Sequence, residues 1–108
     1  MANDHVVLVL STFPSADKAA EIARILVDER LAACVNLVPA VQSIYRWDGA
    51  IQIESEALAL IKTTEAGYSS LAARLVELHP YDVPEIVVVP LAGGHAPYLA
   101  WVGAEVAK

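Results

Sequence analysis

Residues 34–64 read CVNLVPAVQSIYRWDGAIQIESEALALIKTT, and this stretch decides the fold of the chain. Its centre is the turn Trp47-Asp48-Gly49-Ala50. Asp-Gly between two apolar-patterned segments predicts a β-hairpin, because both central residues of a type I′ turn need positive φ. A turn at this dipeptide pairs Trp47 with Ala50 and Val35 with Lys62. Each arm then runs for about 14 residues, or roughly 45 Å.

A hairpin of this length is longer than the domain that would contain it. A compact domain of this size has a diameter near ~35 Å. We therefore expect the hairpin to bend at Pro39 and its tip to reach onto another subunit. Tyr45 and Trp47 lie at the tip, and Tyr and Trp dominate protein–protein contacts, so we predict that they anchor an interface. The alternative is that these two residues and Trp101 form a stacking platform for a ligand.

The composition indicates one domain, residues 1–108, with an excess of apolar side chains. Hydrophobic residues make up 56% of the chain and the mean hydropathy is +0.49, which is high for a small monomer and favours a subunit interface. No apolar segment approaches the ~20 residues of a membrane span. No signal-peptide pattern precedes the first strand, so we expect a cytoplasmic protein.

The net charge and the cysteine content argue against nucleic-acid-binding proteins and disulfide-bonded domains. The net charge is −6 and the basic residues are scattered, which disfavours nucleic-acid binding because that depends on phosphate neutralisation. The single cysteine, Cys34, excludes a disulfide within the chain and is predicted to be a small buried residue.

Hydrophobic periodicity predicts an α+β fold of the ferredoxin-like βαββαβ type with an additional C-terminal helix. The apolar residues of the second hairpin arm change near Ser55 from an alternating pattern to a continuous one, which marks the edge of the subunit body. The first arm should run parallel to the first strand. Residues 11–15 are predicted to form a loop in which Ser15 caps the first helix. The expected elements are strand 6–10, helix 16–30, hairpin arms 34–47 and 50–64, helix 66–78, strand 85–89 and helix 97–106.

No catalytic motif is present: the chain has no GxSxG, P-loop, GxGxxG or HExxH pattern, so we do not expect an enzyme. His79, in a polar turn, is the best single candidate for a metal ligand, although one histidine per subunit makes a weak site unless oligomerisation gathers further ligands. Lys62 and Glu85 lie at strand ends, where they form either a salt bridge or the polar groups of a small-molecule cleft. A remaining enzymatic alternative uses His79 and Glu85 as acid and base.

Four motifs in order along the chain are similar to those of the CutA family, the divalent-cation tolerance proteins. They are Tyr45-Arg46-Trp47-Asp48-Gly49, Ile61-Lys62-Thr63-Thr64, His79-Pro80-Tyr81-Asp82-Val83-Pro84-Glu85-Ile86 and Tyr98-Leu99-Ala100-Trp101. The resemblance implies a homotrimer like the PII signalling proteins, with long β-hairpins that cross between subunits. It also implies a binding or signalling role in the response to copper or another divalent cation. The alternatives are an adaptor trimer without a tight metal site, which binds a protein partner, and a small-molecule sensor.

The resemblance further implies an inter-subunit ligand cleft near five residues, Lys62, His79, Tyr81, Glu85 and Trp101. Copper ligands proposed in the family are a cysteine at the end of the first strand and a histidine pair before the Pro-Tyr motif. The corresponding residues of this chain are Ser11, Leu78 and His79, so only His79 matches that ligand set.

Overall fold

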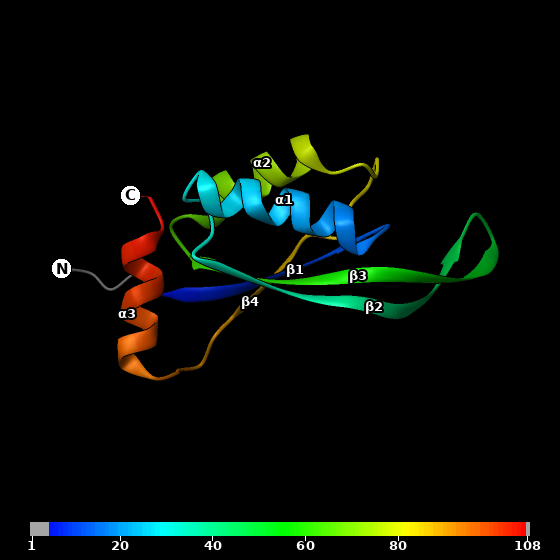
Figure 1. The fold of residues 1–108 in the computed structure, drawn as a ribbon. Coiled ribbons are helices and arrows are strands. Elements are labelled where there is room, and N and C mark those ends of the chain that lie inside the picture. The colour runs from blue at the N-terminus through cyan, green and yellow to red at the C-terminus, as the bar shows by residue number, and fades with distance from the viewer. Residues whose placement is uncertain (1–4, 108) are drawn as a thin grey trace.

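The computed structural model describes residues 5–107, so residues 1–4 and 108 of the predicted domain lie outside the described chain. A four-stranded sheet carries two helices on one face and a third helix at one end (Figure 1). The elements in chain order are β1 (Val6–Phe13), α1 (Ala16–Asp28), β2 (Cys34–Trp47), β3 (Ala50–Thr64), α2 (Tyr68–Leu78), β4 (Val87–Pro90) and α3 (Ala96–Glu105).

The sheet confirms the ferredoxin-like α+β prediction. Its strand order is β2-β3-β1-β4, and every neighbouring pair is antiparallel. Because β1 and β2 are both antiparallel to β3, they run in the same direction, as the sequence predicted. None of the helices described within residues 5–107 is long and apolar enough to cross a membrane.

The hairpin turn has the predicted backbone conformation. Asp48 has a φ of 52° and Gly49 a φ of 80°, and Trp47 pairs with Ala50. The long β2–β3 arm leaves the body and gives the chain a length of 50 Å along its longest axis (Figure 1). The pairing of β1 with β3 ends at Ala57, close to the predicted boundary of the body.

The predicted register is wrong in the half of the hairpin nearest the body. Val35 pairs with Ile61 instead of Lys62. The cause is a β-bulge between Val38 and Val41, where Pro39 and Ala40 on β2 lie opposite a single residue of β3. Proline has no N–H to donate to the ladder, so the bend falls at the expected residue and shifts the pairing by one position.

The first strand is longer than predicted, because residues 11–13 continue β1 and are not a loop. All three are buried, and they pair with residues 57–59 of β3. Pro14 follows the strand, and Ser15 caps α1 as predicted, its hydroxyl accepting a hydrogen bond from the Lys18 N–H at 3.1 Å. The fourth strand starts later than predicted, at Val87, because β4 pairs with β1 only along residues 7–10.

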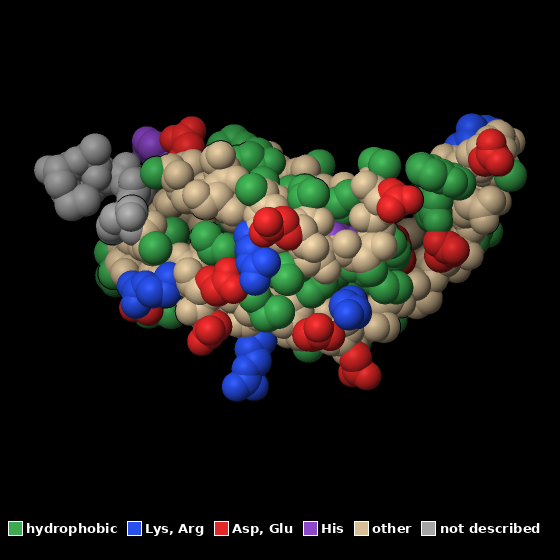
Figure 2. All heavy atoms as spheres, turned by 90° about the horizontal axis from the view of Figure 1, so that it is seen from above, with side chains coloured by type: hydrophobic (Ala, Val, Ile, Leu, Met, Phe, Trp, Pro, Cys, Tyr) green, Lys and Arg blue, Asp and Glu red, His purple; other side chains and the backbone are tan. Residues whose placement is uncertain are grey.

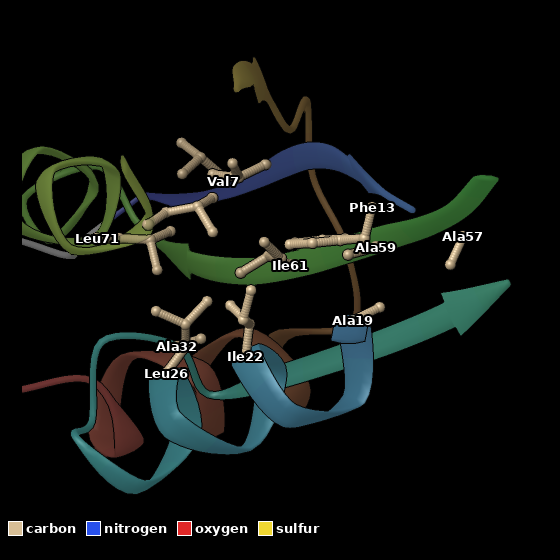
Figure 3. Packing of buried hydrophobic residues seen from close by; sticks show 12 residues of the cluster. Val7, Phe13, Ala19, Ile22, Leu26, Ala32, Ala57, Ala59, Ile61 and Leu71 are labelled. Carbon is tan, nitrogen blue, oxygen red and sulfur yellow. The ribbon is translucent and has the colours of Figure 1, made fainter. Parts of the chain in front are cut away.

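The main core lies between the sheet and helices α1 and α2. Ile22 of α1 points toward Ile61 of β3, with Phe13 and Leu71 in the same cluster (Figure 3). At the end of the sheet, Val102 of α3 packs in a separate small cluster at the start of β1. All four residues of β4 are exposed. Large apolar side chains thus remain uncovered in the single chain.

We predict that Gly49→Ala destabilises the protein by about 1–2 kcal/mol, because a side chain with a Cβ is disfavoured at positive φ. A Cβ at Gly49 meets no atom within 4 Å, so the cost comes from the backbone alone. Urea unfolding measures the change. The control is Gly93→Ala, which also meets no atom within 4 Å but lies outside the positive-φ region. Equal stability of the two variants would contradict the assigned turn.

Candidate functional site

A cleft of about 870 Å³ lies where the hairpin arm leaves the body. One wall is the outer half of the hairpin, and the other is the segment between α2 and β4. Figure 2 shows acidic side chains along the face on which the arm rises from the body. The lining residues are Thr12, Ser43, Ile44, Tyr45, Trp47, Glu54, Glu56, Pro80, Tyr81, Asp82, Val83 and Glu85.

Two tyrosine–glutamate pairs lie in the lining of this cleft. The Tyr45 hydroxyl donates to the Glu54 carboxylate across the hairpin, and the Tyr81 hydroxyl donates to Glu56 Oε2 at 2.7 Å. Glu54 and Glu56 are two positions apart on β3 and therefore point to the same face. The hydrogen bond to Glu54 raises the pKa of Tyr45. Burial, followed by the hydrogen bond to Glu56, raises the pKa of Tyr81 well above its usual range.

His79 holds the second wall against the body. It is the C-cap of α2, its side chain is only 8% exposed, and its ring stacks on Phe13 with centroids 4.6 Å apart. Its Nε2 lies 2.8 Å from the carbonyl oxygen of Thr12, and its Nδ1 accepts the Tyr81 N–H at 3.1 Å. A carbonyl only accepts, so Nε2 carries the proton and the ring is neutral. Burial lowers the pKa of His79 accordingly.

These contacts define what His79 can do. Both ring nitrogens already have hydrogen-bond partners, so a metal ion or a substrate proton would have to displace one of them. Through these contacts His79 ties the start of the segment that carries Tyr81 and Glu85 to the end of β1. Within residues 5–107, no group of three or more His, Cys, Asp and Glu side chains is placed to hold a metal ion.

The cleft has a strongly acidic lining. Glu54, Glu56, Asp82 and Glu85 line it, and its lining contains no Lys or Arg side chain. Aromatic rings and the aliphatic side chains of Ile44 and Val83 supply the remaining surface. Carboxylates beside aromatic faces are suited to a positively charged ligand.

The structure divides the five residues of the predicted ligand cleft into two groups. Tyr81 and Glu85 line the cleft, and His79 is buried behind it. Lys62 lies near the opposite end of the sheet, where it pairs with Leu8 of β1 and Cys34 of β2. Its ammonium group donates a hydrogen bond to Asn36. It forms no salt bridge with Glu85 in the described chain. Trp101 lies on α3 beside Tyr98, with ring centroids 5.7 Å apart.

The other residues singled out by the sequence are also placed. Tyr45 and Trp47, the predicted interface anchors, lie near the tip of the arm. Both side chains are exposed, and both belong to the lining of the cleft. Ser11 is fully buried, and its hydroxyl has no hydrogen-bond partner among the described residues. Leu78 packs against the main core. Cys34, predicted to be buried, is only half-buried at the start of β2, next to the Tyr98 hydroxyl.

Sequence reasoning missed Glu54, Glu56 and Asp82 as members of the site. The sequence feature that could have indicated the two glutamates is the alternation Ile51-Gln52-Ile53-Glu54-Ser55-Glu56. It places Glu54 and Glu56 on one face of the arm. That alternation alone also describes an ordinary solvated face, so it does not distinguish a cleft wall from a free surface.

Comparison with known proteins agrees with the fold and the motifs. The profile of the CutA1 divalent ion tolerance protein family matches residues 7–105. The divalent-cation tolerance protein CutA of Thermus thermophilus is 52% identical over 94 residues, which are 87% of this chain and 91% of that protein. Protein CutA of Mus musculus is 46% identical over 84% of this chain, which spans about half (51%) of the mouse protein. A solved structure of the Thermus thermophilus protein superposes with a TM-score of 0.91 at 48% identity, covering 94% of this chain and 99% of that one.

We predict that the protein loses stability as the pH falls below about 6.5, the ordinary pKa of an unfolded histidine. Because burial lowers the pKa of His79, the unfolded chain binds this proton before the folded chain does, so acidification favours unfolding. The free energy of unfolding in urea, measured from pH 7.5 to pH 5, should show this slope.

The slope should flatten in His79→Gln, whatever the absolute stability of that variant. His95→Gln is the control, because His95 is exposed and makes no side-chain cap hydrogen bond to α3. If His79→Gln kept the full slope, the neutral buried state of His79 would be contradicted.

Proposed function

Because this chain belongs to the CutA1 family of divalent ion tolerance proteins, we propose that it is a homotrimeric binding module in the response to divalent cations such as copper. The number of subunits and the copper response come from the family resemblance. We place the protein in the cytoplasm and assign it a signalling rather than a catalytic role.

The exposed hairpin arm is the observation that carries this proposal. Ile44, Trp47, Ile51 and Ile53 are each more than half exposed on an arm that has left the subunit body. Apolar side chains gathered in this way mark interaction sites in soluble proteins. An arm that lies on a neighbouring subunit would bury these side chains. Such an interface would also account for the high hydrophobic content of the sequence.

The contacts of His79 support a non-catalytic role. A general base needs a free nitrogen within reach of a substrate proton, whereas both nitrogens of His79 are bonded to the backbone. Glu85 is exposed and has no hydrogen bond or ion pair to His79 in the described chain. The acid–base alternative therefore has no support in this geometry.

The second candidate function is an adaptor or small-molecule sensor whose link to metal ions is indirect. The observation that favours it concerns potential metal ligands. Within residues 5–107 of one chain, no group of three or more His, Cys, Asp or Glu side chains is placed to hold a metal ion. A tight divalent-cation site would then need ligands from more than one subunit. The two candidates differ in whether the assembled protein binds metal stoichiometrically.

Native mass spectrometry of the metal-stripped protein, with and without stoichiometric copper(II), separates these possibilities. We expect a trimer that takes up copper in a discrete, saturable step. A trimer with only stepwise nonspecific adducts would favour the adaptor or sensor role. A monomer at micromolar concentration would contradict the proposed assembly.

We predict that Trp47→Ala raises the concentration at which the trimer dissociates by at least about tenfold, as for a buried aromatic interface anchor. Native mass spectrometry on a dilution series measures this change. Val76→Ala is the control, because Val76 is an exposed apolar residue on α2, away from the arm. An unchanged dissociation profile for Trp47→Ala would remove Trp47 from the interface.

A further inference from the structure

We infer that Ser11, Leu78 and His79, the residues that correspond to the proposed copper ligands of the family, do not bind copper in this chain. They are packing and positioning residues at the end of β1 and the end of α2. The proposed metal response, on which this inference rests, therefore needs ligands from elsewhere in the assembled protein. The observations that carry the inference are the burial of Ser11 and Leu78 and the hydrogen bonds of His79.

Ser11 faces the main core of the subunit. Side chains alternate along a strand, so Ser11 points to the same face of β1 as Val9 and Phe13, which belong to that core. It pairs with Ala59 of β3, another core residue, and its side chain is fully buried. A copper ion bound to Ser11 would lie among apolar side chains, where an uncompensated charge is strongly disfavoured.

The Ser11 hydroxyl does not supply the donor that copper prefers. Its Oγ has no hydrogen-bond partner among the described residues, so it is the atom that a bound ion would be expected to contact. Copper favours thiolate and imidazole ligands, whereas a serine hydroxyl is a neutral alcohol. The unpaired hydroxyl therefore marks a cost to stability and does not indicate a metal site.

The other two positions are also occupied by structural contacts. Leu78 has no donor atom and packs against the main core. The Nε2 of His79 donates to the carbonyl oxygen of Thr12, and its Nδ1 accepts the N–H of Tyr81. Both nitrogens thus point at backbone atoms, and copper at either one would leave a carbonyl or an N–H without its partner.

The histidines that are open to solvent in the described chain lie outside this region. His5 precedes β1 and His95 precedes α3, and both are exposed. Imidazole is a common metal ligand, so these two rings are suitable references for His79. His95 is the better reference, because its side chain makes no cap hydrogen bond to α3.

NMR of the intact, isotope-labelled protein during titration with copper(II) chloride tests the inference. Copper(II) is paramagnetic and broadens the signals of the groups that it contacts. We expect the ring signals of His95 to broaden at a lower ratio of copper to protein than those of His79. Broadening of the His79 ring first, or at the same ratio as His95, would overturn the inference.

Native mass spectrometry of the same samples separates this inference from the proposed function. Copper uptake with intact His79 signals would support both. A protein that takes up no copper would contradict the proposed copper binding, while His79 would be unbound, as inferred. Saturable uptake that disappears in His79→Gln, with an unchanged native mass of the metal-stripped trimer, would overturn the inference and leave the copper response in place.

A stability measurement tests the assignment of Ser11 to packing. Ser11→Ala should raise the urea concentration at the midpoint of unfolding, because it removes a buried hydroxyl that has no partner in the described chain. The matched control is Thr63→Val, which removes a buried hydroxyl that donates to the Leu31 carbonyl at 2.8 Å and should lower the midpoint. A lower midpoint for Ser11→Ala would show that the hydroxyl has a bound partner and would overturn its assignment.

Discussion

Strand β3 pairs with neighbours on both sides, and the rest of the structure depends on this pairing. Residues 57–64 lie between β1 and β2, whereas residues 50–56 have only β2 beside them. The inner half is therefore buried in the sheet and the outer half leaves the body as an arm. The change in the hydrophobic pattern near Ser55 coincides with this difference: residues 57, 59 and 61 are buried on the face under the helices, and Leu58 and Leu60 on the other face are half-buried, whereas most residues of the outer half are exposed.

The end of β1 determines where the cleft forms. Phe13 is the last residue of β1, and the ring of His79 stacks on it while Nε2 of His79 bonds to Thr12. The segment after α2 is thereby attached where the arm departs, and Tyr81 reaches across to Glu56. A histidine that sequence patterns favour as a ligand thus acts as a positioning residue, and the acidic side chains around it supply the chemistry of the site.

The arm connects the assembly with the cleft. Trp47 is exposed in the single chain and is the residue proposed to anchor the trimer, yet it also lies at the rim of the cleft. Docking of the arm on a neighbour would fix the outer wall, just as His79 fixes the inner one. The bulge next to Pro39 lies at the base of this arm.

The sequence by itself determined the element order, the Asp48-Gly49 turn, the bend at Pro39 and the ferredoxin-like topology, because turn chemistry and hydrophobic periodicity are local. Only the tertiary structure decided three other features: the extension of β1 through residues 11–13, the register of Val35 against Ile61, and the placement of Lys62 and Trp101 outside the cleft that Tyr81 and Glu85 line within one chain. The extension of β1 depends on which distant strand lies alongside. The register of Val35 depends on the bulge next to Pro39, which the sequence pattern does not reveal, because a period of two residues is the same before and after a one-residue shift in pairing. The role of His79 was hidden for the same reason, since its partners, Thr12 and Phe13, are more than sixty residues away in the chain.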